Sequence, residues 1–116
     1  MDVSALQATM TQALTDLGSI TVLVNNAATN PFFGPMLAIE WPAFLKTFEV
    51  NVSGTFALTR EVSQRLVDAG KPGSVITLSS ILGLGSSPLQ GAYGMTKAAV
   101  IMLTKTVAKE MGGANI

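Results

Sequence analysis

Residues 20–27, ITVLVNNA, lead from a short β-branched and apolar segment directly into two asparagines. The segment from Ile20 to Val24 is apolar toward both faces, which is typical of a buried strand in a parallel sheet. A similar segment, SVITLSS at residues 74–80, follows a turn at residues 71–73, KPG, and ends in two serines. Each expected strand therefore carries polar side chains at its carboxyl end.

Helical segments precede, separate and follow these two strands. Apolar residues recur at three- and four-residue steps from Ser4 to Leu17, where Ser4 and Gln7 have the spacing of a capping box and Gly18 can end the helix. One long helix is expected from Glu40 to Ala69, and a last helix from Gly91 to Met111. The order helix, strand, helix, strand, helix predicts an α/β layered fold with two parallel strands and no internal domain boundary.

The composition limits the chemistry that the chain can perform. Its 116 residues are 48% hydrophobic and 12% charged, which favours a folded domain with buried interfaces over a disordered one. Seven basic residues balance seven acidic ones, so we expect no nucleic-acid partner. Cys and His are both missing and the acids are scattered singly. We therefore expect no disulfide, thiol nucleophile, imidazole base or metal site.

The sequence also bears on location. No apolar run approaches the roughly 20 residues that a membrane helix needs. The first ten residues, MDVSALQATM, lack the basic start and apolar run of a signal peptide. We expect a cytoplasmic protein that does not interact with a membrane.

The segment GAYGMTKAAV, residues 91–100, contains the only Tyr of the chain, Tyr93, four residues before Lys97. This spacing places both side chains on one helix face, with Cβ atoms about 5–6 Å apart. A free phenol is a poor base at neutral pH, and a nearby ammonium favours its ionised form. The pair could thus exchange a proton with an alcohol or carbonyl oxygen. Taken alone, such a pair is more often an accident of an exposed helix.

Three features together favour a functional site over that interpretation. In an open parallel sheet, ligands bind at the carboxyl ends of the strands. Asn25-Asn26 and Ser79-Ser80 both lie at such ends, and the helix with Tyr93 and Lys97 rises from the same edge. The loop GLGSSP at residues 83–88 is a weaker candidate for a phosphate loop. It has Pro88 where the third Gly is needed, so we interpret it as an ordinary flexible loop.

These motifs resemble those of the short-chain dehydrogenase/reductase family. The family's N-N-A-G motif is similar to Asn25-Asn26-Ala27-Ala28, with Ala in place of Gly, and the run NNAATNP also resembles its carbonyl- and retinal-reductase-like branch. The other matching positions are Tyr93 and Lys97 for Tyr-x-x-x-Lys, Ser80 thirteen residues before the Tyr, Asn51 in the long helix, and Asp2-Val3 before the first helix.

The resemblance implies an oxidoreductase that uses NAD or NADP and transfers a hydride to or from a small carbonyl or alcohol substrate. The implied catalytic residues are Asn51, Ser80, Tyr93 and Lys97; the implied cofactor-binding residues are Asp2, Val3, Asn26, Ala27, Ala28, Tyr93 and Lys97. Tyr93 would be the general acid/base, which Lys97 would favour as phenolate while holding the nicotinamide ribose. Ser80 would orient the substrate oxygen, and Asn51 would hold a water that relays protons to Lys97.

The chain also departs from the family, whose members run to about 250 residues as one domain. Residues 1–116 are therefore expected to form a partial Rossmann-like, doubly wound domain that lacks the Gly-rich βαβ unit and the C-terminal substrate region. Without its neighbour, the first strand would expose a hydrophobic edge and face. The alternative is an inactive remnant that associates through helices 40–69 and 91–111, and a homo-oligomer through these helices is expected in either case.

Overall fold

The computed structural model describes residues 2–116. Its elements are α1 (Val3–Leu17), β1 (Val22–Asn25), η1 (Met36–Ala38), α2 (Trp41–Phe48), η2 (Glu49–Gly54), α3 (Thr55–Asp68), β2 (Ser74–Thr77), η3 (Ile81–Gly83), α4 (Gly91–Met111) and η4 (Gly112–Ala114). The strands pair in parallel, with Val22 opposite Ser74 and Asn25 opposite Thr77. The expected α/β order and the parallel pairing are confirmed.

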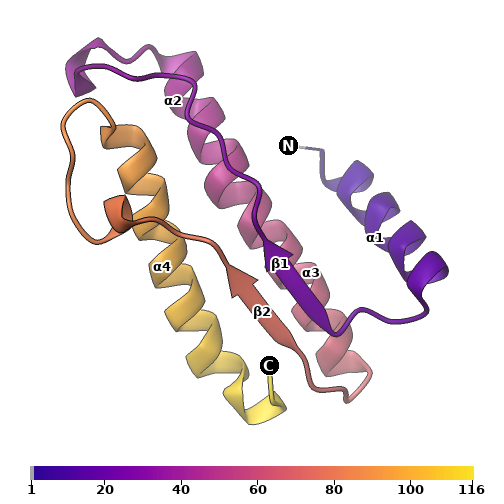
Figure 1. Cartoon of the computed structure of the whole chain (residues 1–116). Coiled ribbons are helices and arrows are strands. Elements are labelled where there is room, and N and C mark those ends of the chain that lie inside the picture. Colours follow the sequence, from indigo (N-terminus) through magenta and orange to yellow (C-terminus); the bar gives the residue numbers. More distant parts are fainter. Residues whose placement is uncertain (1) are drawn as a thin grey trace.

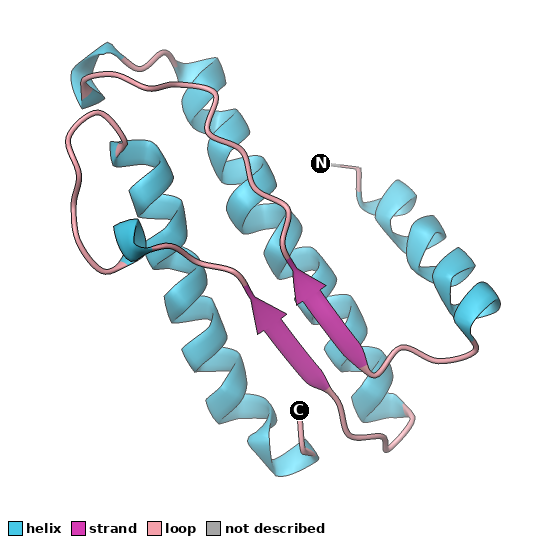
Figure 2. Cartoon of the chain, in the orientation of Figure 1, coloured by secondary structure: helices cyan, strands magenta, loops and turns pink. Residues whose placement is uncertain are grey.

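The elements form two layers. Helices α3 and α4 cover one face of the sheet, and α1 lies beside β1, beyond the edge that β2 does not occupy (Figures 1 and 2). Met10 of α1 meets Val62 and Leu66 of α3 in a small buried apolar cluster, onto which Ile20 and Leu23 pack. The radius of gyration is 15.6 Å, against about 13 Å for a compact domain of roughly 100 residues. The molecule is therefore a thin slab with little apolar interior.

The single helix expected from Glu40 to Ala69 is wrong in one respect. The chain is helical from Trp41 to Asp68, between the capping residues Glu40 and Ala69, but η2, a π-helical segment over Glu49–Gly54, separates α2 from α3. Asn51, Ser53 and Gly54 all have low helix propensity, and Asn and Ser side chains can compete for backbone hydrogen bonds. The wider π turn occurs where Asn51 is buried and bonded to another segment, in keeping with the frequent location of such turns at functional sites.

Two other local expectations differ from the structure. The capping box at Ser4 and Gln7 is not formed, because Asp2 is the N-cap: its Oδ1 accepts hydrogen bonds from the Ala5 amide at 3.1 Å and the Ser4 hydroxyl at 2.7 Å. A carboxylate before the first turn satisfies free amides directly. Both strands are also shorter than expected, so the polar residues Asn26, Ser79 and Ser80 lie beyond the strands. Gly18 ends α1 at a φ of 76°, as expected.

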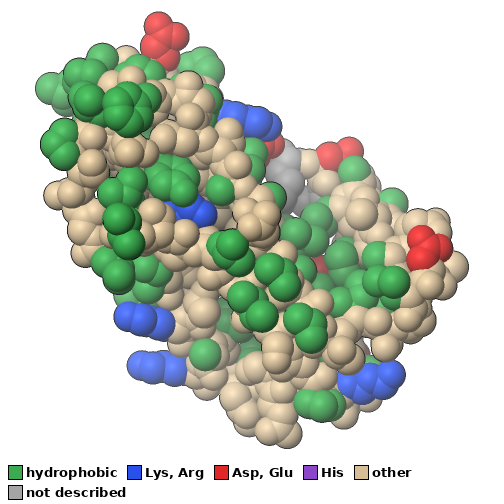
Figure 3. All heavy atoms as spheres, viewed as in Figure 1, with side chains coloured by type: hydrophobic (Ala, Val, Ile, Leu, Met, Phe, Trp, Pro, Cys, Tyr) green, Lys and Arg blue, Asp and Glu red, His purple; other side chains and the backbone are tan. Residues whose placement is uncertain are grey.

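The sheet face turned away from α3 and α4 is open, so β1 is not buried on both faces. Val22 is 56% exposed, Val24 52% and Ile76 49%. Hydrophobic side chains accordingly gather over the strands on the face seen in Figure 3. The apolar pattern of ITVLVNNA suits two covered faces, whereas helices cover only one here. Over the described residues, none of the helices combines the length and apolarity needed to span a membrane.

Candidate active site

The carboxyl ends of the two strands are tied to each other and to α4. The Leu78 amide donates to the Asn25 carbonyl at 3.0 Å, which extends the parallel pairing past β2. The Leu78 carbonyl accepts from the Lys97 ammonium at 2.9 Å, and the Ser79 hydroxyl donates to the Lys97 carbonyl at 2.8 Å. Both the side chain and the backbone of Lys97 are thus held against the end of β2.

Tyr93 and Lys97 meet on one face of α4, as their spacing predicts. The Lys97 Nζ atom lies 5.5 Å from the centre of the Tyr93 ring, within cation–π distance. Lys97 is only 5% exposed, and this burial lowers the pKa of its ammonium from the usual 10.5. Tyr93 itself is half-buried. A desolvated cation next to a partly accessible phenol is an arrangement suited to proton transfer.

Ser80 lies directly before η3 and caps it. Its Oγ accepts a hydrogen bond from the Leu82 amide at 3.1 Å, so its own O–H remains a donor. The turn then docks closely on α4. A Cβ at Gly83 would lie 2.8 Å from the Lys97 carbonyl carbon, and one at Gly94 would lie 3.0 Å from the Leu82 carbonyl oxygen. Close packing against α4 therefore explains why a Gly is present at position 83, and a phosphate-binding role is not needed to explain it.

Asn51 is buried, and its side chain joins three segments. Its Oδ1 accepts from the Thr29 amide at 2.7 Å, while its Nδ2 donates to the Thr29 carbonyl at 2.9 Å and to the Thr96 hydroxyl at 3.0 Å. The Thr96 hydroxyl in turn donates to the Tyr93 carbonyl at 2.7 Å. Both amide hydrogens of Asn51 thus have protein acceptors. The motif spacing in the sequence indicates Asn51 as a site residue but indicates neither Thr29 nor Thr96.

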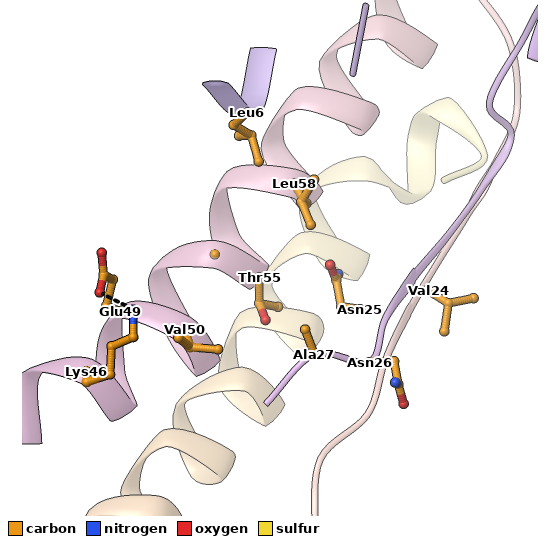
Figure 4. A pocket seen from close by; sticks show the side chains of 11 residues that line it. Leu6, Val24, Asn25, Asn26, Ala27, Lys46, Glu49, Val50, Thr55 and Leu58 are labelled. Atoms are coloured by element: carbon orange, nitrogen blue, oxygen red, sulfur yellow. Dashed lines mark hydrogen bonds and ion pairs between the residues drawn. The ribbon is translucent and has the colours of Figure 1, made fainter. Parts of the chain in front are cut away.

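The residues after β1 divide between interior and surface. Asn25 is buried and donates from Nδ2 to the Thr59 hydroxyl at 2.9 Å, whereas Asn26, Ala27 and Ala28 are exposed. In Figure 4, the Asn25 side chain points toward α3 and that of Asn26 points away from it. A pocket of about 320 Å³ opens here between α1, β1 and the α2–α3 helices, with Leu6, Val24, Val50 and Leu58 among its walls.

The two remaining expected residues lie at the start of α1. The Asp2 carboxylate caps the N-terminus of α1. The hydrogen bonds that it accepts from the Ser4 hydroxyl and the Ala5 amide hold its pKa below the usual value. The side chain of Val3 is outside the described part of the structure. The structure therefore brings Tyr93 and Lys97 into direct contact, links Asn51 to Tyr93 through the Thr96 hydroxyl, and places Ser80 on the adjoining turn.

Comparison with known proteins adds independent findings. A family model described as short chain dehydrogenase matches residues 1–116. The chain is 38% identical over 99 residues to the human protein named dehydrogenase/reductase SDR family member 4, covering 85% of this chain and 35% of that protein. It is 36% identical to carbonyl reductase [NADPH] 2 of Sus scrofa, covering 87% of this chain and 41% of that protein.

Solved structures give the same picture. A 4-hydroxyisoleucine dehydrogenase complexed with NADH superposes with a TM-score of 0.91 at 32% identity, covering 99% of this chain and 50% of that one. The shared fold is the Rossmann fold of these enzymes. The chain spans about half of this structure and less than half of the two curated relatives.

The close docking of η3 on α4 predicts a local effect of Gly83→Ala. The new Cβ would meet the backbone of Lys97, which has no room to yield, so we expect a loss of stability of about 1–3 kcal/mol. Gly85→Ala in the same loop is the matched control, because a Cβ there meets nothing within 4 Å. Urea unfolding of both variants measures the difference. Equal midpoints would contradict the tight contact.

Burial of Lys97 predicts a pH dependence of stability. Its folded pKa lies below the unfolded 10.5, so between these values the unfolded chain binds the extra proton and stability rises with pH. Below the folded pKa, the cost of burying the charge is fully present. We expect Lys97→Met to remove this alkaline rise, and Lys105→Met, at an exposed position of α4, to keep it. The measurement is the free energy of unfolding across the alkaline range. A rise that survives in Lys97→Met would refute the assignment.

Proposed function

The chain belongs to the short-chain dehydrogenase family, and on that premise we propose that it carries the proton-transfer site of an NAD(P)-dependent oxidoreductase acting on a carbonyl or alcohol. The observation that carries the proposal is the Tyr93–Lys97 pair, whose buried ammonium lies 5.5 Å from the phenol ring centre. The family relationship supplies the reaction class, and this geometry supplies the residues.

Tyr93 is the proposed general acid/base. In reduction it donates its phenolic proton to the carbonyl oxygen, and in oxidation it takes a proton from the alcohol. The Lys97 ammonium stabilises the phenolate left behind, because opposite charges at this separation attract strongly in a desolvated site. Leu78 holds the ammonium in place through its carbonyl. The Lys97 side chain therefore needs no reorganisation when Tyr93 changes its charge.

Ser80 is the proposed group that orients the substrate oxygen. Its Oγ is fixed by the Leu82 amide, which leaves the hydroxyl hydrogen to donate to that oxygen. Asn51 is the proposed fourth member of the site. The hydrogen bonds of Asn51 to Thr29 and Thr96 hold its own helical turn, η2, against the Thr29 loop and α4. The expected binding of a relay water by Asn51 is part of the same proposal.

The proposed cofactor is NAD or NADP, which when bound supplies or accepts the hydride. The residues after β1 and the Lys97 ammonium are suited to bind part of this cofactor. Ala27 and Ala28 are small and exposed after β1, so the backbone there is open to a ligand, and Asn26 points away from the helices. The Lys97 ammonium has three N–H donors. One of them bonds to the Leu78 carbonyl, so the other two can donate to a ribose hydroxyl. Asp2 and Val3 are the proposed neighbours of the adenine.

The cofactor assignment is tested by titrating the chain with NADH and, separately, NADPH. We expect saturable binding of at least one of them, lost in Lys97→Ala and retained in Lys105→Ala, because only Lys97 would hold the ribose. Fluorescence of the reduced nicotinamide measures the binding. Lack of saturation with both cofactors, or equal binding by the two Lys variants, would count against the proposal. In a parallel assay with a small ketone and saturating cofactor, Tyr93→Phe should lower turnover by about 10²–10⁴-fold, because the phenolic proton is no longer available.

Association through α2–α3 and α4 is a second part of the proposal. Trp41 is 73% exposed, Phe56 51% and Met102 64%, so α2, α3 and α4 each carry a large exposed apolar side chain. Burying such residues against a second copy would stabilise both chains.

The association proposal predicts that Phe56→Glu and Met102→Glu shift the chain toward a monomer, because a charge buried at an apolar interface is costly. Leu37→Glu is the control, since Leu37 is fully exposed in η1, outside these helices. Sedimentation velocity measures the oligomeric state. A monomeric wild type at all concentrations would show that the helices do not associate.

A further inference from the structure

Thr96 has an unusual position for a helix threonine. It is 0% exposed, and its hydroxyl lies in the middle of a hydrogen-bond chain that runs from the loop after β1 to the first turn of α4. It accepts from Asn51 Nδ2 at 3.0 Å and donates to the Tyr93 carbonyl at 2.7 Å. The donor and one acceptor site of the hydroxyl are both used by groups that belong to the proposed site.

A second threonine of α4 provides a comparison for these contacts. Thr104 of α4 donates to the carbonyl of Val100, four residues earlier, which is the ordinary contact of a helix threonine. Thr96 reaches the carbonyl three residues earlier instead, which is that of Tyr93, and it also accepts from another element. Its hydroxyl therefore joins two elements, whereas that of Thr104 stays within its own helix.

The bond from Asn51 to Thr96 is a buried link between the Thr29 loop and α4. At the surface, Asn30 of the same loop donates from Nδ2 to Gln90 Oε1 at 3.2 Å, directly before α4. The Asn51 amide faces both the N–H and the carbonyl of Thr29, so amide and loop are fixed as one unit. The remaining amide hydrogen goes to Thr96. Without that hydroxyl, a buried N–H would lack an acceptor, which is unfavourable enough to displace the amide. The loop with Ala27 and Ala28 would then lose its buried connection to the turn that carries Tyr93 and would keep the exposed contact between Asn30 and Gln90.

We propose that Thr96 is a positioning residue that couples the loop after β1 to the Tyr93 turn through Asn51. The proposal rests on the proposed function in one respect, since the two segments it joins are those assigned to cofactor binding and to proton transfer. Thr96 acts through Asn51 and the Tyr93 backbone and contacts neither substrate nor cofactor.

The test compares Thr96→Val, which keeps the shape and removes the hydroxyl, with Thr96→Ser, which keeps the hydroxyl. Thr104→Val is the matched control on the same helix. Hydrogen exchange by NMR should show the Thr29 amide exchanging about tenfold faster or more in Thr96→Val and near the wild-type rate in the other two. The ring signals of Tyr93, the only Tyr, should shift in Thr96→Val alone.

Amides of Val62 and Leu66 in the apolar cluster report on global opening and should keep their wild-type exchange rates. Unchanged Thr29 exchange in Thr96→Val would overturn the proposal, and so would equal acceleration of the Val62 and Leu66 amides. If Thr96→Val does not fold, Thr96→Ala against Thr96→Ser makes the same comparison. The exchange result stands apart from the NADH titration, so a failure of the proposed function and a failure of this coupling are distinguishable.

Discussion

The buried ammonium of Lys97 is the constraint on which the rest of the site depends. A desolvated cation is tolerable only if an acceptor meets it, and the Leu78 carbonyl does so at 2.9 Å. That bond requires β2 to end at a fixed height on α4, because Leu78 follows the strand directly. Ser79 then reaches the Lys97 carbonyl, and the chain turns through Ser80 onto the same helix. One polar contact thus sets the register between sheet and helix at the proposed site.

The interior around this contact is polar. Among the described residues, eight polar or charged side chains are buried against five apolar ones, and Asn51, Thr55, Thr59 and Thr96 are among the eight. Their hydrogen bonds are directional, so they specify one arrangement of α3, α4 and the strand ends more narrowly than apolar packing would. The apolar cluster of Met10, Val62 and Leu66 holds α1 against α3. It stabilises the slab without touching Tyr93 or Lys97.

Much of this could be predicted from local patterns. The helix from Gly91 to Met111 was predicted at both ends, because its spacing and its closing glycines agree, and both strands were predicted from their β-branched cores. The π turn was not predicted, because the low helix propensity of Asn51 and Gly54 alone does not say whether a helix breaks, bends or widens. The Thr29–Asn51–Thr96 chain was missed. Its bonds span 22 and 45 residues, and nothing in the local sequence pairs them.

The same structure explains why the proposed proton-transfer geometry and the open sheet face can coexist. Val22, Val24 and Ile76 are exposed on the sheet face away from α3 and α4. Lys97 lies on α4, on the other side of the sheet, and bonds to the Leu78 carbonyl just after β2. A parallel sheet offers both its faces to packing but only its carboxyl ends to ligands. Covering the open face would therefore stabilise the strands without altering the bond of Asn51 to Thr96 or the contacts of Lys97 with Tyr93 and Leu78.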